Sequence, residues 1–248
     1  MSFKEIAPVY DRFNNLDAYD QWLDYTLNAL SSQPEKVLDL ACGTGWFCAL
    51  LSPFVGHITA VDIDPDMLAM AKAAGDYTNV TYQVGDMLDL SDYDQDFDLV
   101  TCYADSLCFL DDFDQVGQAL TQMYERLKPG AVLLFDVWTP YQVTAGFDGF
   151  SYFDSDERGA ILWDSEVDPE AACVTHYLTV FDQTGPEGAY TRTDAQLVER
   201  AYPLEAYLQH FKSLGADDLT ISVDFGANDY DPRIHAQADR WFFRVVKS

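Results

Sequence analysis

One stretch decides the fold of this chain: Val37-Leu38-Asp39-Leu40-Ala41-Cys42-Gly43-Thr44-Gly45-Trp46-Phe47. Its first half is an apolar run of strand length that contains a single carboxylate. Gly43 and Gly45 follow, and because glycine tolerates positive φ and has no side chain, the backbone there turns sharply and approaches a ligand closely. The stretch predicts a strand, a tight loop that binds a ligand, and then a helix. An ordinary strand-to-helix turn is the alternative for an isolated pair of glycines.

The next segment completes a βαβ unit and favours the ligand-binding interpretation. A short β-branched run from His57 ends in Asp62, and Asp64 with Pro65 supplies an N-cap and a first-turn proline for the following helix. Asp62 follows Asp39 by 23 residues. In a doubly wound sheet, an acidic residue at this position binds the hydroxyls of a ribose. The two signals together predict a cofactor that contains adenosine.

The details of the glycine loop indicate which cofactor this is. A dinucleotide fingerprint has a third glycine, which allows close packing beside a pyrophosphate, and Cys48 stands at that position here. Asp39 would repel a pyrophosphate and attract an ammonium group. S-Adenosylmethionine carries an ammonium and a sulfonium and no phosphate. A nicotinamide or flavin oxidoreductase, which shares the βαβ unit, is the disfavoured alternative.

In these features the chain resembles the class I S-adenosylmethionine-dependent methyltransferases, and the resemblance extends over nearly its whole length. Five ordered motifs carry it: Asp39–Gly45, Val61–Asp64, Tyr82–Met87, Phe97–Leu107 and Leu127–Val137. In the first motif, Ala41 replaces the family's first glycine. The resemblance implies a doubly wound seven-stranded Rossmann-like methyltransferase sheet of the α/β class, with the last strand antiparallel.

The resemblance also implies which residues hold S-adenosyl-L-methionine. Asp62 binds the ribose, Ile63 and Met67 border the adenine, Asp86 approaches the adenine amino group and Met87 lies along the ring. The remaining residues of the implied cofactor site are Tyr10, Asp39, Ala41, Gly43, Gly45 and Tyr103. Tyr10 belongs to a segment that covers the cofactor in the family, and core packing is the expected role of the nearby Trp22.

A narrower likeness concerns an inserted segment. The opening Ile6–Phe13 and the segment Trp163–Tyr202 are similar to a group of stand-alone bacterial methyltransferases that carry an antiparallel β insertion after the fifth strand. The substrate of that group is generally unassigned. We therefore expect a methyltransferase domain over 1–140 and 200–248, and an inserted antiparallel β subdomain over 141–199 that covers the site. Asp168-Pro169-Glu170 and Gly185–Gly188 predict two of its turns.

Periodicity predicts the remaining elements. Helices are expected near 18–31, 46–54, 65–75, 112–128 and 203–214, and strands near 36–41, 57–62, 80–84, 97–103, 131–137, 217–224 and 240–246. Because ligands bind beyond the carboxyl ends of parallel strands, residues such as Asp86 and Tyr103 are expected to lie around one crevice.

Composition and charge restrict the partners. The chain has 14 Lys and Arg against 42 Asp and Glu, a net charge of −28, and contains no basic run, which disfavours a nucleic-acid substrate. A small neutral or cationic acceptor fits better, although a solvated acidic surface alone also explains the charge. No apolar run is long enough to span a membrane and no signal peptide is evident, so we expect a cytoplasmic protein, monomer or homodimer. The five cysteines form no C-x-x-C pair, which predicts reduced thiols and no metal site.

The implied reaction is direct displacement at the sulfonium methyl by a nucleophile of a small-molecule acceptor. Because the sulfonium is already electrophilic, the protein contributes mainly alignment and exclusion of water. If the acceptor must lose a proton, Asp105, Asp136 or His176 is the candidate catalytic base. Each has a structural alternative: Asp105 caps the turn after the fourth strand, Asp136 orients a loop, or His176 faces solvent. A non-catalytic module that binds S-adenosylmethionine or a protein partner is the alternative function.

Overall fold

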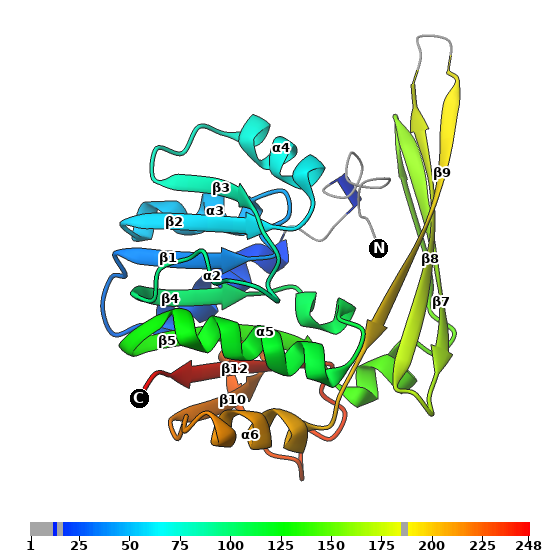
Figure 1. The fold of residues 1–248 in the computed structure, drawn as a ribbon. Helices are drawn as coiled ribbons and strands as arrows, with labels where there is room; N and C mark the ends of the chain where they lie inside the picture. The colour runs from blue at the N-terminus through cyan, green and yellow to red at the C-terminus, as the bar shows by residue number, and fades with distance from the viewer. Residues whose placement is uncertain (1–11, 14–16, 185–187) are drawn as a thin grey trace.

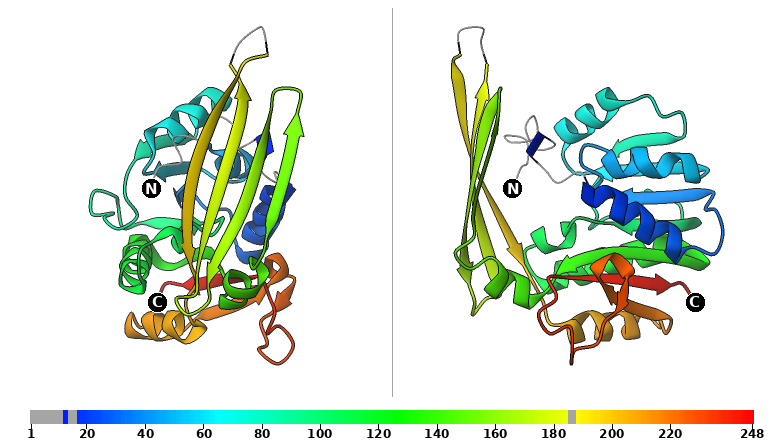
Figure 2. Two further views of the ribbon diagram at one scale, coloured as in Figure 1. Left: turned by 90° about the vertical axis from the view of Figure 1, so that its right-hand side faces the viewer. Right: turned by 180° about the vertical axis from the view of Figure 1, so that it is seen from behind.

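The chain forms two separate β-sheets. The structure is a computed structural model that describes residues 12–13, 17–184 and 188–248. An eight-stranded mixed sheet with helices on both faces makes up the main body, and a four-stranded antiparallel sheet stands beside it (Figure 1). Two further views show the smaller sheet as one long curved layer that runs alongside the main body (Figure 2). The predicted α/β fold with an antiparallel insertion is confirmed.

The main sheet has the expected doubly wound order. Its strands, in spatial order, are β11 (Asn228–Asp229), β10 (Leu219–Val223), β12 (Arg240–Val246), β5 (Leu127–Trp138), β4 (Phe97–Cys102), β1 (Lys36–Leu40), β2 (His57–Asp62) and β3 (Val80–Val84). The strands β1 to β5 pair in parallel, and β12 pairs antiparallel with both β5 and β10. The predicted seven strands and the antiparallel last strand are present, and the two-residue β11 adds a short eighth.

Helices cover the two faces because successive strand residues point to opposite sides. The α-helices are α2 (Asp17–Ala29), α3 (Trp46–Leu51), α4 (Pro65–Ala74), α5 (Phe113–Arg126) and α6 (Leu204–Ser213). On β1, Val37 packs in a core with residues of α2 and α3, whereas its neighbour Leu38 packs in a core with residues of α5 and α6. Both faces of β1 are therefore buried, as a central parallel strand requires.

The smaller sheet is a four-stranded antiparallel meander. Its strands, in spatial order, are β6 (Ser151–Asp156), β7 (Gly159–Asp168), β8 (Cys173–Gln183) and β9 (Tyr190–Arg200). Asp168 forms the predicted turn between β7 and β8, since its Oδ1 accepts hydrogen bonds from the amides of Glu170 and Ala171. The turn predicted at 185–188 lies mostly outside the described residues. One face of the sheet is buried, and it packs against the segment after β4.

The largest boundary difference is at β5, which begins at Leu127 rather than near Ala131. Pro129 explains the difference, because a proline disfavours helical geometry in the residue before it and pushes Lys128 toward an extended conformation. Helix α5 accordingly ends at Arg126, and Leu127 pairs with Phe97 of β4 before a register shift. Short one-turn segments that were not predicted include η3 (Ser106–Phe109) and η4 (Gln142–Gly146).

Candidate functional site

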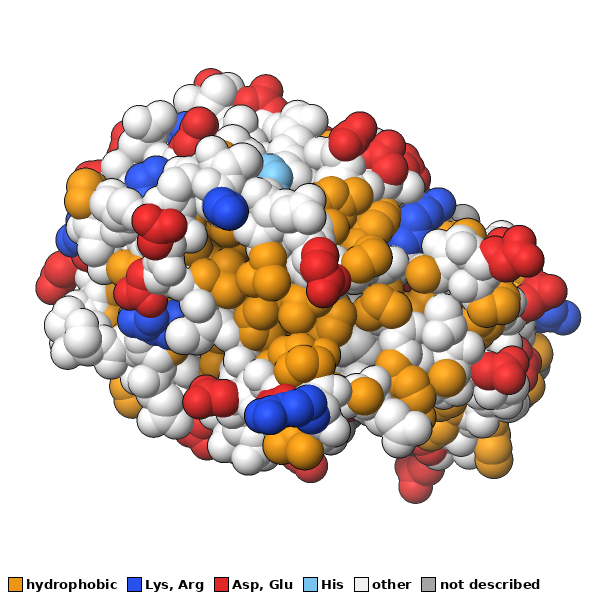
Figure 3. Space-filling view, turned by 90° about the horizontal axis from the view of Figure 1, so that it is seen from below, with side chains coloured by type: hydrophobic (Ala, Val, Ile, Leu, Met, Phe, Trp, Pro, Cys, Tyr) orange, Lys and Arg blue, Asp and Glu red, His pale blue; other side chains and the backbone are white. Residues whose placement is uncertain are grey.

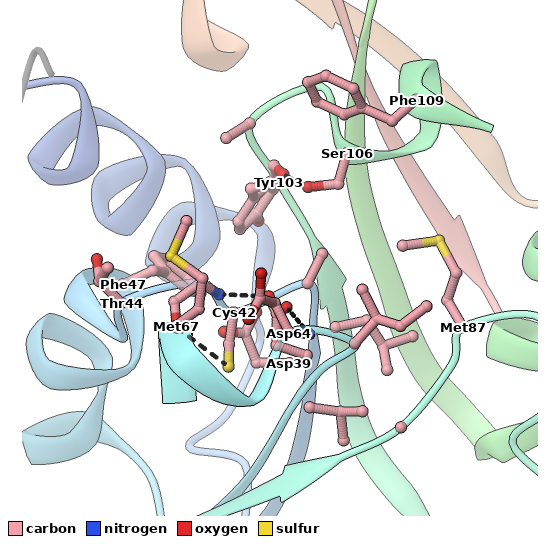
Figure 4. Close-up of a pocket in the computed structure, with 18 of the residues that line it drawn as sticks. Asp39, Cys42, Thr44, Phe47, Asp64, Met67, Met87, Tyr103, Ser106 and Phe109 are labelled. Atoms are coloured by element: carbon pink, nitrogen blue, oxygen red, sulfur yellow. Dashed lines mark hydrogen bonds between the residues drawn. The ribbon is translucent and has the colours of Figure 1, made fainter. Parts of the chain in front are cut away.

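A pocket lies beyond the carboxyl ends of β1, β2 and β4 (Figure 4). Its empty volume is about 1410 Å³, which includes space open to solvent. The lining residues come from the ends of β1 and β2, from the loops after β1 to β4, and from α2, α3, α4 and η3: Tyr19, Asp39, Leu40, Ala41, Cys42, Gly43, Thr44, Phe47, Val61, Asp62, Ile63, Asp64, Met67, Gly85, Asp86, Met87, Tyr103, Ala104, Ser106, Phe109 and Leu110. The predicted crevice is therefore where the topology requires it to be.

The loop after β1 has the strained backbone expected of a ligand cradle. Ala41 and Gly43 both have a φ of 54°, in the left-handed region. A Cβ added to Gly43 would meet nothing within 4 Å, so its backbone borders open space in the pocket. Gly45 also belongs to the predicted site, but it does not line the pocket. It begins α3 with a φ of 80°, and a Cβ there would lie 2.7 Å from the Tyr82 hydroxyl.

Replacing Gly45 with alanine is expected to destabilise the protein by about 2–3 kcal/mol, because left-handed geometry costs an L-residue about 1–2 kcal/mol and Tyr82 must also move. Gly130→Ala is the matched control: Gly130 has the same φ of 80° and nothing within 4 Å of its added Cβ. The difference in unfolding free energy between the two variants measures the contact with Tyr82. Equal losses would show that the close approach of Tyr82 has no energetic weight.

Asp62, at the end of β2, holds the glycine loop and faces the pocket. Its Oδ2 accepts a hydrogen bond of 2.8 Å from the Gly43 amide, and its Oδ1 accepts one of 2.8 Å from the Asp64 amide. Burial raises the pKa of the Asp62 carboxyl, and these amides act in the opposite direction. The side chain thus links the first two strands at the crevice, where ribose recognition is predicted.

Asp39 is a buried carboxyl at the floor of the pocket. It accepts hydrogen bonds from Thr101 Oγ1 at 2.6 Å and from Cys48 Sγ at 3.0 Å. Burial raises the pKa of Asp39 to about 6, and the bonds from Thr101 and Cys48 only partly oppose this. A charge in this position is therefore costly for the protein alone, and a bound cation would offset that cost.

The residues predicted to border the adenine line the pocket from α4 and from the loops after β2 and β3. Met67 of α4 is buried, and Ile63 is 66% exposed. Asp86 is exposed, and its Oδ1 accepts a hydrogen bond from the Leu88 amide. Met87 extends toward the pocket from the loop after β3 (Figure 4). These residues supply apolar contacts and one exposed carboxylate, which suit a purine with an exocyclic amino group.

The segment after β4 forms the remaining wall. Tyr103 is buried and its hydroxyl shares a hydrogen bond of 2.7 Å with Thr26 of α2. Ser106 and Phe109 of η3 lie beyond it in the close-up view (Figure 4). Phe109 also packs against the buried face of the smaller sheet. The segment after β4 therefore contacts both the pocket and the smaller sheet.

The lining residues fit S-adenosylmethionine by their charge. Four carboxylates line the pocket, from Asp39, Asp62, Asp64 and Asp86, and no Lys or Arg is among the described lining residues. A pyrophosphate would meet only like charges there, whereas a ligand with an ammonium and a sulfonium would meet opposite ones. The negative charge of the lining side chains thus disfavours a dinucleotide and matches the predicted cofactor.

The variant Asp39→Asn is expected to stabilise the ligand-free protein at pH 7 and to weaken binding of the cationic cofactor. The folded pKa of Asp39, about 6, exceeds its ordinary value of 3.8, so its contribution to stability is present below about pH 4 and is lost as the pH rises through 6. The variant's hydrogen bonds to Thr101 and Cys48 are expected to be weaker, which reduces the benefit. The expected gain in the free energy of unfolding at pH 7 is therefore on the order of 1–2 kcal/mol. Thermal unfolding at pH 7 and pH 4 checks this, since the gap between variant and wild type should close at pH 4. A less stable variant at pH 7 would contradict it.

None of the three predicted catalytic bases lines the pocket. Asp136 is fully buried, and each of its oxygens accepts two hydrogen bonds. Their donors are Trp22, Arg240 and the amides of Ala104 and Asp105. Asp136 therefore fixes the turn after β4, and Trp22 has the expected buried position. Arg240 also donates to Asp105 Oδ1 at 2.7 Å, which makes it the bridge between two carboxylates.

His176 lies on β8, on the buried face of the smaller sheet. Its exposed fraction is 0%, so the alternative in which it faces solvent is wrong. The ring Nδ1 lies 2.7 Å from Ser165 Oγ, and the Nε2 lies 3.8 Å from the Glu199 carboxyl. Burial lowers the pKa of His176 to about 4, so the imidazole is neutral at pH 7.

Sequence reasoning missed several residues that shape this region. Phe109 and Ser106 belong to a one-turn helix without a periodic signal, and Arg240 is an isolated cation more than a hundred residues from its partners. Glu199 could have been found from the alternation along β9, which places this carboxylate on the inward face beside Leu197. Tyr10 lies outside the described residues.

The face shown in Figure 3 carries charges of both signs around a hydrophobic centre. Lys and Arg side chains are scattered there among acidic ones. No helix in the described part of the chain is long and apolar enough to cross a membrane. The five cysteines are free; Cys42 and Cys173 are only half-buried. Among the described residues, no group of His, Cys, Asp and Glu side chains is arranged to hold a metal ion.

Comparisons with known proteins agree with this geometry. The sequence model of the family described as "Methyltransferase domain" matches residues 37–130. The chain is 30% identical over 249 residues to "Putative methyltransferase YqeM" of Bacillus subtilis (strain 168), and the match covers 100% of this chain and 98% of that protein.

Two solved structures share the fold over nearly the whole chain. An S-adenosylmethionine-dependent methyltransferase from Clostridium acetobutylicum ATCC 824 superposes with a TM-score of 0.80 at 24% identity, covering 98% of both chains. The sugar N-methyltransferase KedS8 from Streptoalloteichus sp ATCC 53650 does so with a TM-score of 0.74 at 22% identity, covering 95% of this chain and 89% of the other. With the pocket and its carboxylates, these matches show that the chain belongs to the class I S-adenosylmethionine-dependent methyltransferases.

Proposed function

We propose that this enzyme transfers the methyl group of S-adenosylmethionine to a small-molecule acceptor by direct displacement. The observation that carries the proposal is the pocket beyond β1, β2 and β4, which presents four carboxylates and no basic side chain among its described lining residues. When bound, the cofactor supplies an electrophilic methyl group on sulfur. The chain itself must bind, align and shield the reactants.

Three of the four lining carboxylates have a proposed partner on the cofactor. Asp62 binds the ribose hydroxyls and Asp39 favours the ammonium group. Asp86 accepts a hydrogen bond from the adenine amino group. The family resemblance gives the assignments of Asp62 and Asp86, and the charge of Asp39 gives its own; the position of all three carboxylates on the pocket wall supports them.

The apolar contacts and the loop backbone complete the proposed cofactor site. Met67, Met87 and Ile63 enclose the adenine, and the backbone of Ala41 and Gly43 approaches the cofactor closely. Gly45 contributes by setting the turn into α3. Tyr10 remains a proposed contact on the segment before the described residues.

Tyr103 and the turn after β4 would keep water from the reacting atoms. The Tyr103 ring packs edge-on against Phe47 at 5.0 Å between centroids and is held by Thr26, so its position is fixed. An aromatic face beside the cofactor's positive charge stabilises it by about 0.5–2 kcal/mol. Asp105 and Asp136 would act by holding Arg240 and this turn, since their contacts leave them away from the pocket.

Charge and resemblance support a small-molecule acceptor. The net charge of −28 is unsuited to a polyanionic substrate. KedS8, which shares the fold, is a sugar N-methyltransferase. A cytoplasmic location, a monomeric or homodimeric state and the absence of nucleic-acid partners stay predictions.

An acceptor screen tests the proposed function. Release of S-adenosylhomocysteine is followed over a library of amines, alcohols, thiols and carbon acids, with the cofactor alone as the blank. Turnover with at least one compound above the blank is the expected result. Tight binding of S-adenosylhomocysteine without turnover on any class would favour the alternative, a non-catalytic module that binds the cofactor or a protein partner.

A further inference from the structure

A polar layer lies within the buried face of the smaller sheet, outside the cofactor pocket. Ser165 of β7 pairs with His176 of β8, and Glu199 of β9 pairs with Val174 of β8, so that the three polar side chains share one face. Apolar clusters lie on both sides of this layer along the strands. One contains Ile161, Leu178, Val180 and Leu197, and the other contains Val143, Phe147, Val174 and Ala201.

Several polar atoms of this layer lack a hydrogen bond. Glu199 Oε2, His176 Nε2 and the Trp163 indole Nε1 make no hydrogen bond within the described residues, although the His176 Nε2 lies 3.8 Å from the Glu199 Oε2 and the Trp138 indole acts on the Glu199 carboxyl. Glu199 is 5% exposed and His176 is 0% exposed, so solvent does not reach them freely. A buried polar atom without a hydrogen bond costs about 1–3 kcal/mol, and an apolar side chain in the same place would be more stable. The layer is therefore poorly explained by stability and is a candidate binding site.

The electrostatics of the layer favour a cation. Asp105 and Asp136 share the single guanidinium of Arg240, which also lies 3.7 Å over the ring of Trp138. Glu199 adds a third carboxyl beside this cluster and lacks a cationic partner of its own among the described residues. Burial raises the pKa of Glu199 well above its usual range, the Asp105 carboxylate adds to the rise, and the Trp138 indole opposes it. A bound anion would meet like charge, whereas a bound cation would make the Glu199 carboxylate favourable.

The surrounding groups match an ammonium in particular. An ammonium has up to three donors, and a carboxylate oxygen and a neutral imidazole nitrogen are acceptors. Nε2 of His176 is available as an acceptor when Nδ1 donates to Ser165, and burial keeps the ring neutral. Aromatic rings stand around the pair, since Phe147 and Trp163 lie 4.8 and 5.2 Å from the His176 ring. Indole and phenyl rings favour cations over anions.

The layer adjoins the wall of the cofactor pocket. On β9, the guanidinium of Arg200, next to Glu199, reaches the Leu110 carbonyl at 3.5 Å, and Leu110 lines the pocket. Phe109 of η3 lines the pocket and also packs on the cluster beside the layer. The segment after β4 thus borders both the cofactor pocket and the polar layer.

We propose that Glu199, together with His176 and the indoles of Trp138 and Trp163, binds an amine group of the methyl acceptor as an ammonium ion. This inference rests on the proposed function and narrows its acceptor class to amine-bearing small molecules.

Matched small molecules test the inference in the wild-type protein without any variant. The protein is saturated with S-adenosylhomocysteine, and its melting temperature is measured with benzylamine, benzyl alcohol and benzoate, and with cyclohexylamine and cyclohexanol. The amines are expected to raise the melting temperature and to change the tryptophan fluorescence of the protein, whereas the alcohols and benzoate have little effect. An equal response to alcohols, or no response to either amine, would overturn the inference.

Glu199→Gln then tests the named carboxylate. This nearly isosteric change is expected to weaken binding of the responding amine about tenfold and to leave stabilisation by S-adenosylhomocysteine unchanged. Glu166→Gln is the matched control, because Glu166 lies on the exposed face of the same sheet and contacts Tyr177. Unchanged amine binding in Glu199→Gln would overturn the inference. Turnover confined to compounds without an amine would also overturn it and leave the methyltransferase function intact, whereas failure of the cofactor to bind would overturn the proposed function.

Discussion

Asp136→Ala is expected to lower the free energy of unfolding by about 3–5 kcal/mol, the usual cost of removing one partner from a buried ion pair. The side chain is fully buried and Arg240 is 8% exposed, so neither group can turn to bulk water. For a chain of this size, the loss corresponds to a fall of about 6–20 °C in the melting temperature.

The size of the effect follows from what Asp136 leaves behind. Its removal deprives Arg240 of one of two carboxylates and leaves the Trp22 indole and the amides of Ala104 and Asp105 without an acceptor. Each orphaned buried donor adds to the cost. Because those two amides form the turn that carries part of the pocket wall, cofactor binding should weaken as well.

Two variants control this measurement. Asp136→Asn keeps an acceptor oxygen and should lose less stability. Asp194→Ala removes a carboxylate whose pair with Arg192 is largely exposed, with side-chain exposures of 58% and 60%, and should cost far less than Asp136→Ala because solvent screens the pair. Thermal and denaturant unfolding without ligand provide the values. If Asp136→Ala lowered the free energy of unfolding as little as Asp194→Ala, the buried cluster around Asp136 would not stabilise the fold as expected.

The main sheet could be predicted from the sequence because its signals are local. The run that ends in Asp39 is a strand by its own composition, and Asp64 caps α4 by accepting from the Asp66 amide, as its position before Pro65 predicts. The spacing of Asp39 and Asp62 then fixes two ends of neighbouring parallel strands. Such features need no knowledge of distant parts of the chain.

The roles of the predicted bases could not be obtained in this way. Whether Asp136 is a free base or a buried anchor depends on Arg240, which is 104 residues away. His176 shows the same limit: alternation places it on one face of a strand, but which face is buried depends on what the inserted sheet packs against. The unpartnered state of Glu199 likewise exists only in the folded arrangement.

Asp62→Ala is expected to weaken binding of S-adenosylhomocysteine by about 10- to 100-fold. A hydrogen bond to a charged group contributes about 1.5–3 kcal/mol, and the ribose offers two hydroxyls to this carboxylate in the proposed complex. At a ligand concentration of 100 times the dissociation constant, the wild-type protein gains about 2.7 kcal/mol of stability. The variant at the same concentration should keep only about 0.4–1.4 kcal/mol of that gain.

Asp62→Ala is expected to weaken binding for a second reason, the loss of hydrogen bonds within the protein, and a second variant separates the two reasons. Asp62 also accepts hydrogen bonds from the amides of Gly43 and Asp64, so removing its side chain loosens the glycine loop before any ligand binds. Asp62→Asn retains one acceptor oxygen for these amides but loses the charge. Calorimetric titration of wild type and both variants, with melting temperatures of the ligand-free proteins alongside, distinguishes the contributions. If Asp62→Ala bound S-adenosylhomocysteine as tightly as wild type, the ribose would have to be held by another group, and the cofactor could not lie at the end of β2 as proposed.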